Sequence, residues 1–252
     1  MTKICIYNKS FFYLFLVSLL LFTSCVKKHE KQKGRVVRYS GSENIQNIPK
    51  SQSAEKKTIP PPRTSSRTFS GPEIFEKYNT AVFMIFTSDG LSNYQGSGFF
   101  ISPQGIAVSN YHVFQGTTIG KERIRLSDGT TFTIRNVIKT SQSEDLIIFQ
   151  LESNRQNFNF IPIAAKSPKV GEKVFAIGSP LGLENTFSSG EISQRRENNM
   201  LQISVPIDHG SSGGALINEY GEAIGITTGG LKESGANLNF AIDIKVVEKY
   251  LK

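Results

Sequence analysis

Beyond Gly71, apolar residues fall in short runs that alternate with polar positions and are separated by turn-forming residues. This pattern predicts strands rather than long helices, and the Asp128-Gly129 pair between two runs is typical of a hairpin. A short helix is expected at 72–79 and a closing helix at 244–251. The regular spacing predicts an all-β sandwich or barrel, with strands at 81–87, 96–101, 105–109, 123–126, 131–137, 145–151, 173–177, 190–193, 200–205, 215–218, 223–227 and 237–242.

Charge is distributed unevenly along the 252 residues, whose net charge is +8. Residues 26–70 hold eleven basic and three acidic side chains, whereas residues 71–252 hold 16 basic and 18 acidic ones. The basic character therefore belongs to the N-terminal part and not to the expected folded domain. A nucleic-acid-binding domain is disfavoured, because its basic surface should lie on the folded part.

The N-terminus has the pattern of a secretory leader. Lys3 and Lys9 precede an apolar run at 11–22, which is too short to span a bilayer comfortably. The following Thr-Ser-Cys resembles a bacterial lipoprotein processing site, with residues 1–24 as signal peptide and Cys25 as the lipidated residue. A plain signal peptide cut nearby is the alternative. Either interpretation predicts a location outside the cytoplasm, and the first predicts a lipid anchor in the bacterial cell envelope.

Residues 25–70 are polar, basic and proline-bearing, so they are predicted to be a disordered tether that holds the domain off the membrane. Their positive charge favours contact with anionic lipid headgroups. Cys5 and Cys25 are the two cysteines, and both lie in the leader region. The folded domain therefore has no disulfide or thiol nucleophile, and no Cys/His cluster suits zinc. We expect no metal and no cofactor.

A serine lies among glycines in the segment Asp208-His209-Gly210-Ser211-Ser212-Gly213-Gly214-Ala215. Serine is a weak nucleophile, so an enzyme that uses it needs a base within hydrogen-bond reach and amide N–H groups directed at the developing oxyanion. Glycines allow the backbone that close approach, although a tight turn without chemistry also explains them. The choice depends on whether a histidine and an acid occur elsewhere.

The chain has three histidines. His29 lies in a charged run after the leader, and His209 is too near Ser212 along the chain to fold back easily onto its hydroxyl. His112 remains, at a point where an apolar strand runs into a polar turn. Asp145 enters another apolar strand, where a carboxylate is tolerable mainly if a group such as an imidazole pairs with it.

The order of these residues discriminates between serine-hydrolase scaffolds. Residues 210–214 also match the G-x-S-x-G nucleophile elbow, but that fold places its histidine after the serine, and none follows Ser212. The subtilisin order needs an acid before the histidine, and Asp89, in a turn-like Ser-Asp-Gly, is poorly suited to burial. The order His112, Asp145, Ser212 is that of chymotrypsin.

Several further segments occur in a characteristic joint order: Gly96-Ser97-Gly98-Phe99-Phe100-Ile101, Ser109-Asn110-Tyr111-His112-Val113, Glu144-Asp145-Leu146, Ala176-Ile177-Gly178-Ser179-Pro180-Leu181-Gly182, Ser189-Gly190-Glu191-Ile192-Ser193, Gly210-Ser211-Ser212-Gly213-Gly214-Ala215-Leu216 and Asn239-Phe240-Ala241-Ile242. Through them the chain resembles, from about Pro72 to Ile242, chymotrypsin-fold serine proteases of the bacterial HtrA/Deg type, and their joint order carries this resemblance. It implies a protease domain at 71–252 made of two six-stranded antiparallel β-barrels, 71–160 and 161–252. The family's PDZ domains are not expected in this chain, and trimerisation is left open.

The resemblance also implies a role for each residue. Ser212 would attack the scissile carbonyl, His112 would accept and return the proton, and Asp145 would orient the imidazole. The oxyanion hole would come from the N–H groups of Gly210 and Ser212, with Ser211 between them. Trypsins activated from zymogens carry an aspartate where Ser211 stands, so that route of activation is not expected.

Two further residues are implied to contact substrate. Ile207 and Leu238 would line the pocket for the residue before the cleaved bond, which predicts a small or medium aliphatic side chain there. Both could equally be barrel core. The predicted function is a membrane-tethered serine endopeptidase acting on envelope or misfolded polypeptides. A catalytically silent fold that binds proteins, and an esterase with the same three residues, are the alternatives.

Overall fold

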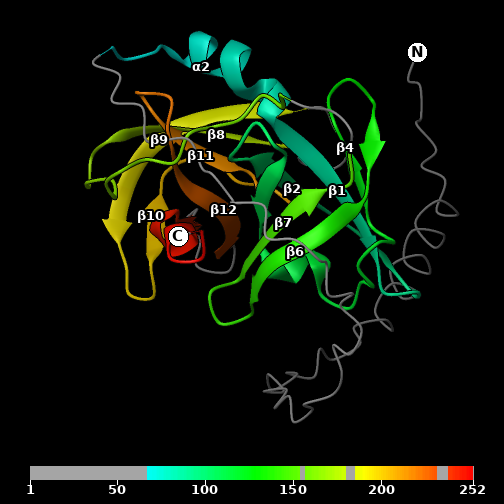
Figure 1. Ribbon diagram of the computed structural model, residues 1–252. Helices are drawn as coiled ribbons and strands as arrows, with labels where there is room; N and C mark the ends of the chain where they lie inside the picture. The colour runs from blue at the N-terminus through cyan, green and yellow to red at the C-terminus, as the bar shows by residue number, and fades with distance from the viewer. Residues whose placement is uncertain (1–66, 154–156, 180–184, 232–237, 252) are drawn as a thin grey trace, which may run out of the picture. The chain divides into compact units, whose positions relative to one another are not determined.

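The computed structural model describes residues 67–153, 157–179, 185–231 and 238–251. Backbone contacts divide the chain into two units, Met1–Ala54 and Glu55–Lys252, and every described residue belongs to the second. Strands dominate this unit and form two sheets, so the all-β prediction is confirmed. In Figure 1 the green strands of the first sheet lie beside the yellow and brown strands of the second.

The first sheet is open and has seven antiparallel strands in the order β5-β4-β1-β2-β3-β7-β6, where a closed six-stranded barrel was expected. Its strands are β1 (Val82–Ser88), β2 (Asn93–Phe100), β3 (Ile106–Ser109), β4 (Arg123–Arg125), β5 (Thr131–Phe132), β6 (Ile134–Ser141) and β7 (Leu146–Leu151).

The additional strand arises because the predicted strand 131–137 changes partners halfway. Phe132 pairs with β4, whereas Ile134 pairs with β7. At the point where the chain changes partners, the N–H of Ile134 donates to the buried carboxylate of Glu122 at 2.6 Å and not to a neighbouring strand. The hydrogen-bond ladder is therefore interrupted, and β5 and β6 end on opposite edges of the sheet.

The second sheet closes into a barrel of six strands, as predicted, in the order β10-β13-β12-β11-β8-β9. Its strands are β8 (Lys173–Gly178), β9 (Thr186–Arg195), β10 (Met200–Ile203), β11 (Ala215–Asn218), β12 (Ala223–Leu231) and β13 (Leu238–Asp243).

The predicted N-terminal helix is α2 (Gly71–Tyr78), which continues as a 3-10 turn, η1 (Asn79–Ala81). Its start is fixed by Glu73, whose carboxylate accepts hydrogen bonds from the N–H and hydroxyl of Ser70 at 2.8 and 2.7 Å. Because Glu73 is the third residue of the helix, this arrangement belongs to a capping box, which pairs backbone groups that a helix start leaves unpaired.

The C-terminal helix is shorter than the predicted 244–251 and covers only α3 (Lys245–Glu248). Beyond it, Tyr250 and Leu251 donate their N–H groups to carbonyls three residues earlier, at 3.0 and 3.3 Å. Such bonds wind the chain more tightly than an α-helix.

The two sheets share one core. A cluster of buried side chains combines residues of the first sheet, such as Phe99 and Val108, with residues of the barrel, such as Ile177 and Ile226. Each sheet also has a cluster of its own. Burial of a common apolar surface joins the sheets into one folded unit and fixes the loops at their boundary.

Candidate functional site

The glycine-rich segment around Ser212 forms a tight turn. The N–H of Ser211 donates to the carbonyl of Asp208 at 3.0 Å, and Gly210, the third residue of the turn, has a φ of 92°. His209, the second residue, does not have a positive φ. These values define a type II turn, which requires a left-handed third residue and therefore favours glycine there.

Backbone N–H groups along this segment alternate between paired and unpaired. Those of Ser211, Gly213 and Gly214 donate to nearby carbonyl oxygens. Within the described part of the chain, the N–H groups of Gly210 and Ser212 have no hydrogen-bond acceptor. Two unpaired N–H groups beside a serine hydroxyl are what an oxyanion hole needs.

The turn is attached to the first sheet through Ser97 of β2, which is fully buried. Its hydroxyl donates to the carbonyl of Gly210 at 2.7 Å and accepts from the N–H of Ser179 at 2.9 Å. Its own N–H donates to the carbonyl of Ser212 at 2.7 Å. Sequence reasoning did not assign this role, because these hydroxyl partners lie 113 and 82 residues away along the chain.

His112 and Asp145 are paired at the boundary of the first sheet. His112 lies on a 3-10 turn, η2 (Tyr111–Phe114), that follows β3. Its Nδ1 is 2.8 and 3.0 Å from the two carboxylate oxygens of Asp145, and its backbone N–H donates to Oδ1 at 2.9 Å. The carboxylate thus holds both the ring and the backbone of one residue, which directs Nε2 away from the aspartate.

Asp145 has an unusual backbone for a non-glycine residue, with a φ of 48°. Its carbonyl accepts hydrogen bonds from the N–H of Tyr111 and the side-chain amide of Asn110, at 3.1 and 3.2 Å. From the barrel, the hydroxyl of Thr228 donates to its Oδ2 at 3.3 Å. Sequence reasoning missed Thr228, since a threonine within an apolar strand carries no local sign of such a contact.

Ser212 lies near the segment that carries His112. A side chain at Gly96 would collide with Val113 at 2.6 Å and come within 3.2 Å of the Ser212 carbonyl, so both residues flank this glycine. Among the described residues, no hydrogen bond joins the Ser212 hydroxyl to His112. Catalytic hydrogen bonds are often long without substrate and shorten in the Michaelis complex.

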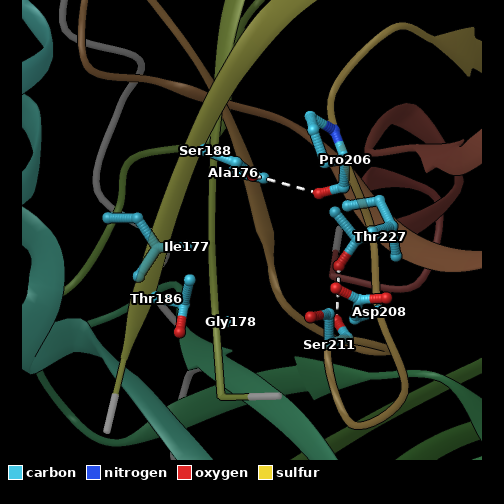
Figure 2. Close-up of a pocket in the computed structure, with 10 residues that line it drawn as sticks. Ala176, Ile177, Gly178, Thr186, Ser188, Pro206, Asp208, Ser211 and Thr227 are labelled. Atoms are coloured by element: carbon cyan, nitrogen blue, oxygen red, sulfur yellow. Dashed lines mark hydrogen bonds between the residues drawn. The ribbon is translucent and has the colours of Figure 1, made fainter. Parts of the chain in front are cut away.

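A cavity of about 90 Å³ lies beside the turn, between the segment 206–211 and the facing ends of β8 and β9. Figure 2 shows Pro206, Asp208, Ser211 and Thr227 along one side of it and Ile177 on the other. Ile207, predicted to contact substrate, is half-buried and among its lining residues. Asp208 adds an acid that the aliphatic prediction did not consider.

Leu238, the other residue predicted to contact substrate, is half-buried at the start of β13 and is not among the residues that line this cavity. Its backbone pairs with Leu231 of β12. The structure therefore brings only one of the two predicted residues to the cavity.

The leader, Cys25 and most of the predicted tether lie outside the described residues. In the described ranges, no helix combines the length and apolar character needed to cross a membrane. The same ranges contain no group of three or more His, Cys, Asp or Glu side chains arranged to hold a metal ion.

Two packed β units, a His–Asp pair on the first and a serine turn on the second, define the chymotrypsin-like class of serine peptidases. The sequence profile described as "Trypsin-like peptidase domain" matches residues 96–226. The chain belongs to this trypsin-like peptidase family.

Several relatives share this domain. The chain is 36% identical over 175 residues to "Protease Do-like 1, chloroplastic" of Arabidopsis thaliana, covering 64% of this chain and 39% of the relative. It is 35% identical over 188 residues to "Serine protease HTRA2, mitochondrial" of Drosophila virilis, covering 69% and 43%. The chain thus spans less than half the length of these relatives.

Solved structures show the same fold. A serine endoprotease from Yersinia pestis superposes with a TM-score of 0.64 at 28% identity, covering 74% of this chain and 68% of that one. The HtrA-type protease AlgW, solved with a tripeptide, superposes with a TM-score of 0.64 at 25% identity, covering 71% and 62%.

Proposed function

We propose that this chain is a serine endopeptidase that uses Ser212, His112 and Asp145. The observation that carries the proposal is the 2.8 Å contact between His112 Nδ1 and Asp145, together with the turn of Ser212, where the N–H groups of Gly210 and Ser212 have no acceptor among the described residues. Family membership supports it, because the relatives' names denote proteases. The reaction needs no cofactor, since side chains and backbone amides supply all its groups.

In the proposed reaction, the Ser212 hydroxyl attacks the carbonyl carbon of the scissile peptide bond while His112 Nε2 accepts its proton. Asp145 keeps the other ring nitrogen protonated and stabilises the imidazolium that forms. The tetrahedral intermediate collapses when the C–N bond breaks and His112 returns the proton to the leaving amine. Water then attacks the acyl-enzyme with His112 again as base, and Ser212 is regenerated.

The oxyanion of both tetrahedral intermediates would be bound by the N–H groups of Gly210 and Ser212. Because the turn already leaves these two groups unpaired, no refolding of the segment is needed before they bind the oxyanion. The proposed substrates are polypeptides of the cell envelope or misfolded proteins. A small or medium aliphatic residue before the cleaved bond suits Ile207 in the cavity wall.

A fluorophosphonate probe tests this proposal. The wild-type protein should be labelled at Ser212 and should cleave a denatured protein substrate, whereas folded Ser212→Ala should do neither. Cleavage by Ser212→Ala would disprove the assignment of the nucleophile. Absence of labelling in the wild-type protein, with and without a denatured substrate, would favour the silent binding fold. Turnover of esters but not peptides would identify an esterase.

We further propose that lipidated Cys25 tethers the enzyme to a bacterial membrane, outside the cytoplasm. The proposal is supported by the basic residues and the apolar run before Thr-Ser-Cys, and by the basic composition of residues 26–70. Palmitate labelling in bacterial cells should mark the wild-type protein and not Cys25→Ser. Processing without any lipid label would instead indicate a plain signal peptide.

A further inference from the structure

Asp145 owes its position to a short turn whose backbone is strained. Its N–H donates to the carbonyl of Gln142 at 3.2 Å, and the turn ends with Asp145 in the left-handed region at a φ of 48°. A non-glycine residue keeps such a backbone only when its surroundings hold it in place. What holds this turn therefore also determines where the carboxylate of Asp145 lies.

The residue before it, Glu144, connects the turn to the C-terminal end of the described chain. Its Oε2 accepts a hydrogen bond from the hydroxyl of Tyr250 at 2.7 Å, and its Oε1 forms an ion pair with Lys249. The side chain of Glu144 is only 18% exposed, whereas that of its partner Lys249 is 48% exposed, so the carboxylate is the poorly solvated member of the ion pair. Burial alone would raise the pKa of Glu144, but the bonds from Lys249 and Tyr250 outweigh it and lower that pKa below its usual value.

Tyr250 is itself held firmly. Its ring packs against the shared core, its N–H donates to the carbonyl of Val247 at 3.0 Å, and the ammonium group of Lys139 on β6 lies 4.6 Å from the ring centre. Val247 is fully buried. The half-buried ring that carries the Tyr250 hydroxyl is therefore held in place by its packing against the core and by its own backbone hydrogen bond.

We propose that Glu144 and Tyr250 form a latch that positions Asp145 against His112. The inference rests on the proposed function, in which that pair orients the general base. Adjacent Cα atoms are about 3.8 Å apart, so movement of Glu144 is passed directly to Asp145. Glu144 and Tyr250 are positioning residues, because neither touches His112 or Ser212. The segment after α3 would thus control the alignment of the catalytic groups.

Two conservative variants test the latch, with one matched control. Tyr250→Phe removes only the hydroxyl, and Glu144→Gln removes the charge at constant size. Glu248→Gln, the control, breaks the ion pair of Glu248 with Lys245 on α3, which does not reach the turn of Asp145. Both latch variants should be labelled by fluorophosphonate about tenfold more slowly than wild type, since small displacements of catalytic groups reduce rates strongly. The control should be labelled at the wild-type rate.

A spectroscopic measurement tests the latch without relying on turnover. In the Ser212→Ala background, the low-field NMR resonance of the His112 Nδ1 proton reports its hydrogen bond to Asp145. Tyr250→Phe should shift or broaden this resonance, whereas Glu248→Gln should leave it unchanged. An unchanged resonance in Tyr250→Phe would overturn the latch, even if labelling fell through loss of stability. If wild type is not labelled but the resonance shifts, the proposed function fails and the positioning role stands.

Discussion

Ser97→Ala is the substitution that most directly tests how the turn of Ser212 is held. The hydroxyl of Ser97 makes two hydrogen bonds, to the Gly210 carbonyl and from the buried N–H of Ser179. Leaving a buried N–H without a partner costs about 1–3 kcal/mol, and the second lost bond about 1 kcal/mol. We therefore expect a loss of about 3 kcal/mol in the free energy of unfolding, measured by urea denaturation.

The same substitution should also slow the chemistry. Without the Ser97 hydroxyl, the Gly210 carbonyl is no longer fixed, and the peptide groups of the turn can rotate away from the oxyanion. Complete removal of one oxyanion donor costs about 10²–10³-fold in rate, so loosening it should reduce fluorophosphonate labelling by about tenfold. Labelling is measured at a temperature and urea concentration where the variant is fully folded.

Ser102→Ala is the matched control. Ser102, in the connection between β2 and β3, is also fully buried, and its hydroxyl accepts from the N–H of Ile106 at 3.2 Å, away from the turn of Ser212. It should lose stability by about 1–3 kcal/mol but keep the wild-type labelling rate. Equal labelling rates for folded Ser97→Ala and Ser102→Ala would refute the idea that Ser97 positions the oxyanion hole. If Ser97→Ala had the same free energy of unfolding as wild type, the claim that the two hydrogen bonds of the Ser97 hydroxyl stabilise the fold would be refuted.

Three further outcomes are expected. Gly213→Ala should lower the free energy of unfolding by about 3 kcal/mol in urea denaturation, because Gly213 has a φ of 90° and the new Cβ would lie 2.0 Å from a backbone oxygen of β2. Gly90 has the same φ but open space around it, so Gly90→Ala should lower the free energy of unfolding by only about 1 kcal/mol. Thr228→Val should slow fluorophosphonate labelling by about twofold without changing thermal stability, since the Thr228 hydroxyl makes one long hydrogen bond to Asp145. An unchanged labelling rate would show that this hydroxyl does not contribute to the site. Because hydrogen bonds from Lys249 and Tyr250 lower the pKa of Glu144 from its ordinary 4.5 despite its burial, its stabilising effect is complete above that value and disappears as pH falls through the lower folded-state value. The stability difference between wild type and Glu144→Gln should therefore shrink as pH falls below about 4.5, and a constant difference would contradict the ion pair.

Features that depend on local pattern were predictable from the sequence. Strand β11 has the predicted bounds, 215–218, because its apolar residues face the core between clear turn signals. The hairpin at Asp128-Gly129 joins β4 and β5, with Gly129 at a φ of 82°. The His112–Asp145 pairing was also accessible, because scarce histidines and residue order leave few combinations.

Features that depend on contacts between distant segments were not predictable. Asp145 was expected to begin a strand, yet it ends a strained turn and β7 starts at Leu146. Its neighbour Glu144 meets Tyr250 at a separation of 106 residues. No periodicity encodes such a contact, since it arises only when folding brings the middle of the domain against its C-terminal end.

The structure adds most to the sequence analysis at the oxyanion hole, where it shows what holds the turn in place. By resemblance, Ser211 stands where zymogen-activated trypsins have an aspartate, so no charged side chain at that position can fix the turn. The structure provides neutral substitutes: the buried hydroxyl of Thr227 donates to the Ser211 carbonyl at 2.6 Å, and that of Ser97 donates to the Gly210 carbonyl. Each of these consecutive carbonyls is bound by a buried hydroxyl, one from each sheet. The Gly210–Ser211 and Ser211–Ser212 peptide groups therefore have little freedom to rotate. An oxyanion hole held in this way requires neither a newly freed N-terminus nor an ion pair, and its geometry should be insensitive to salt.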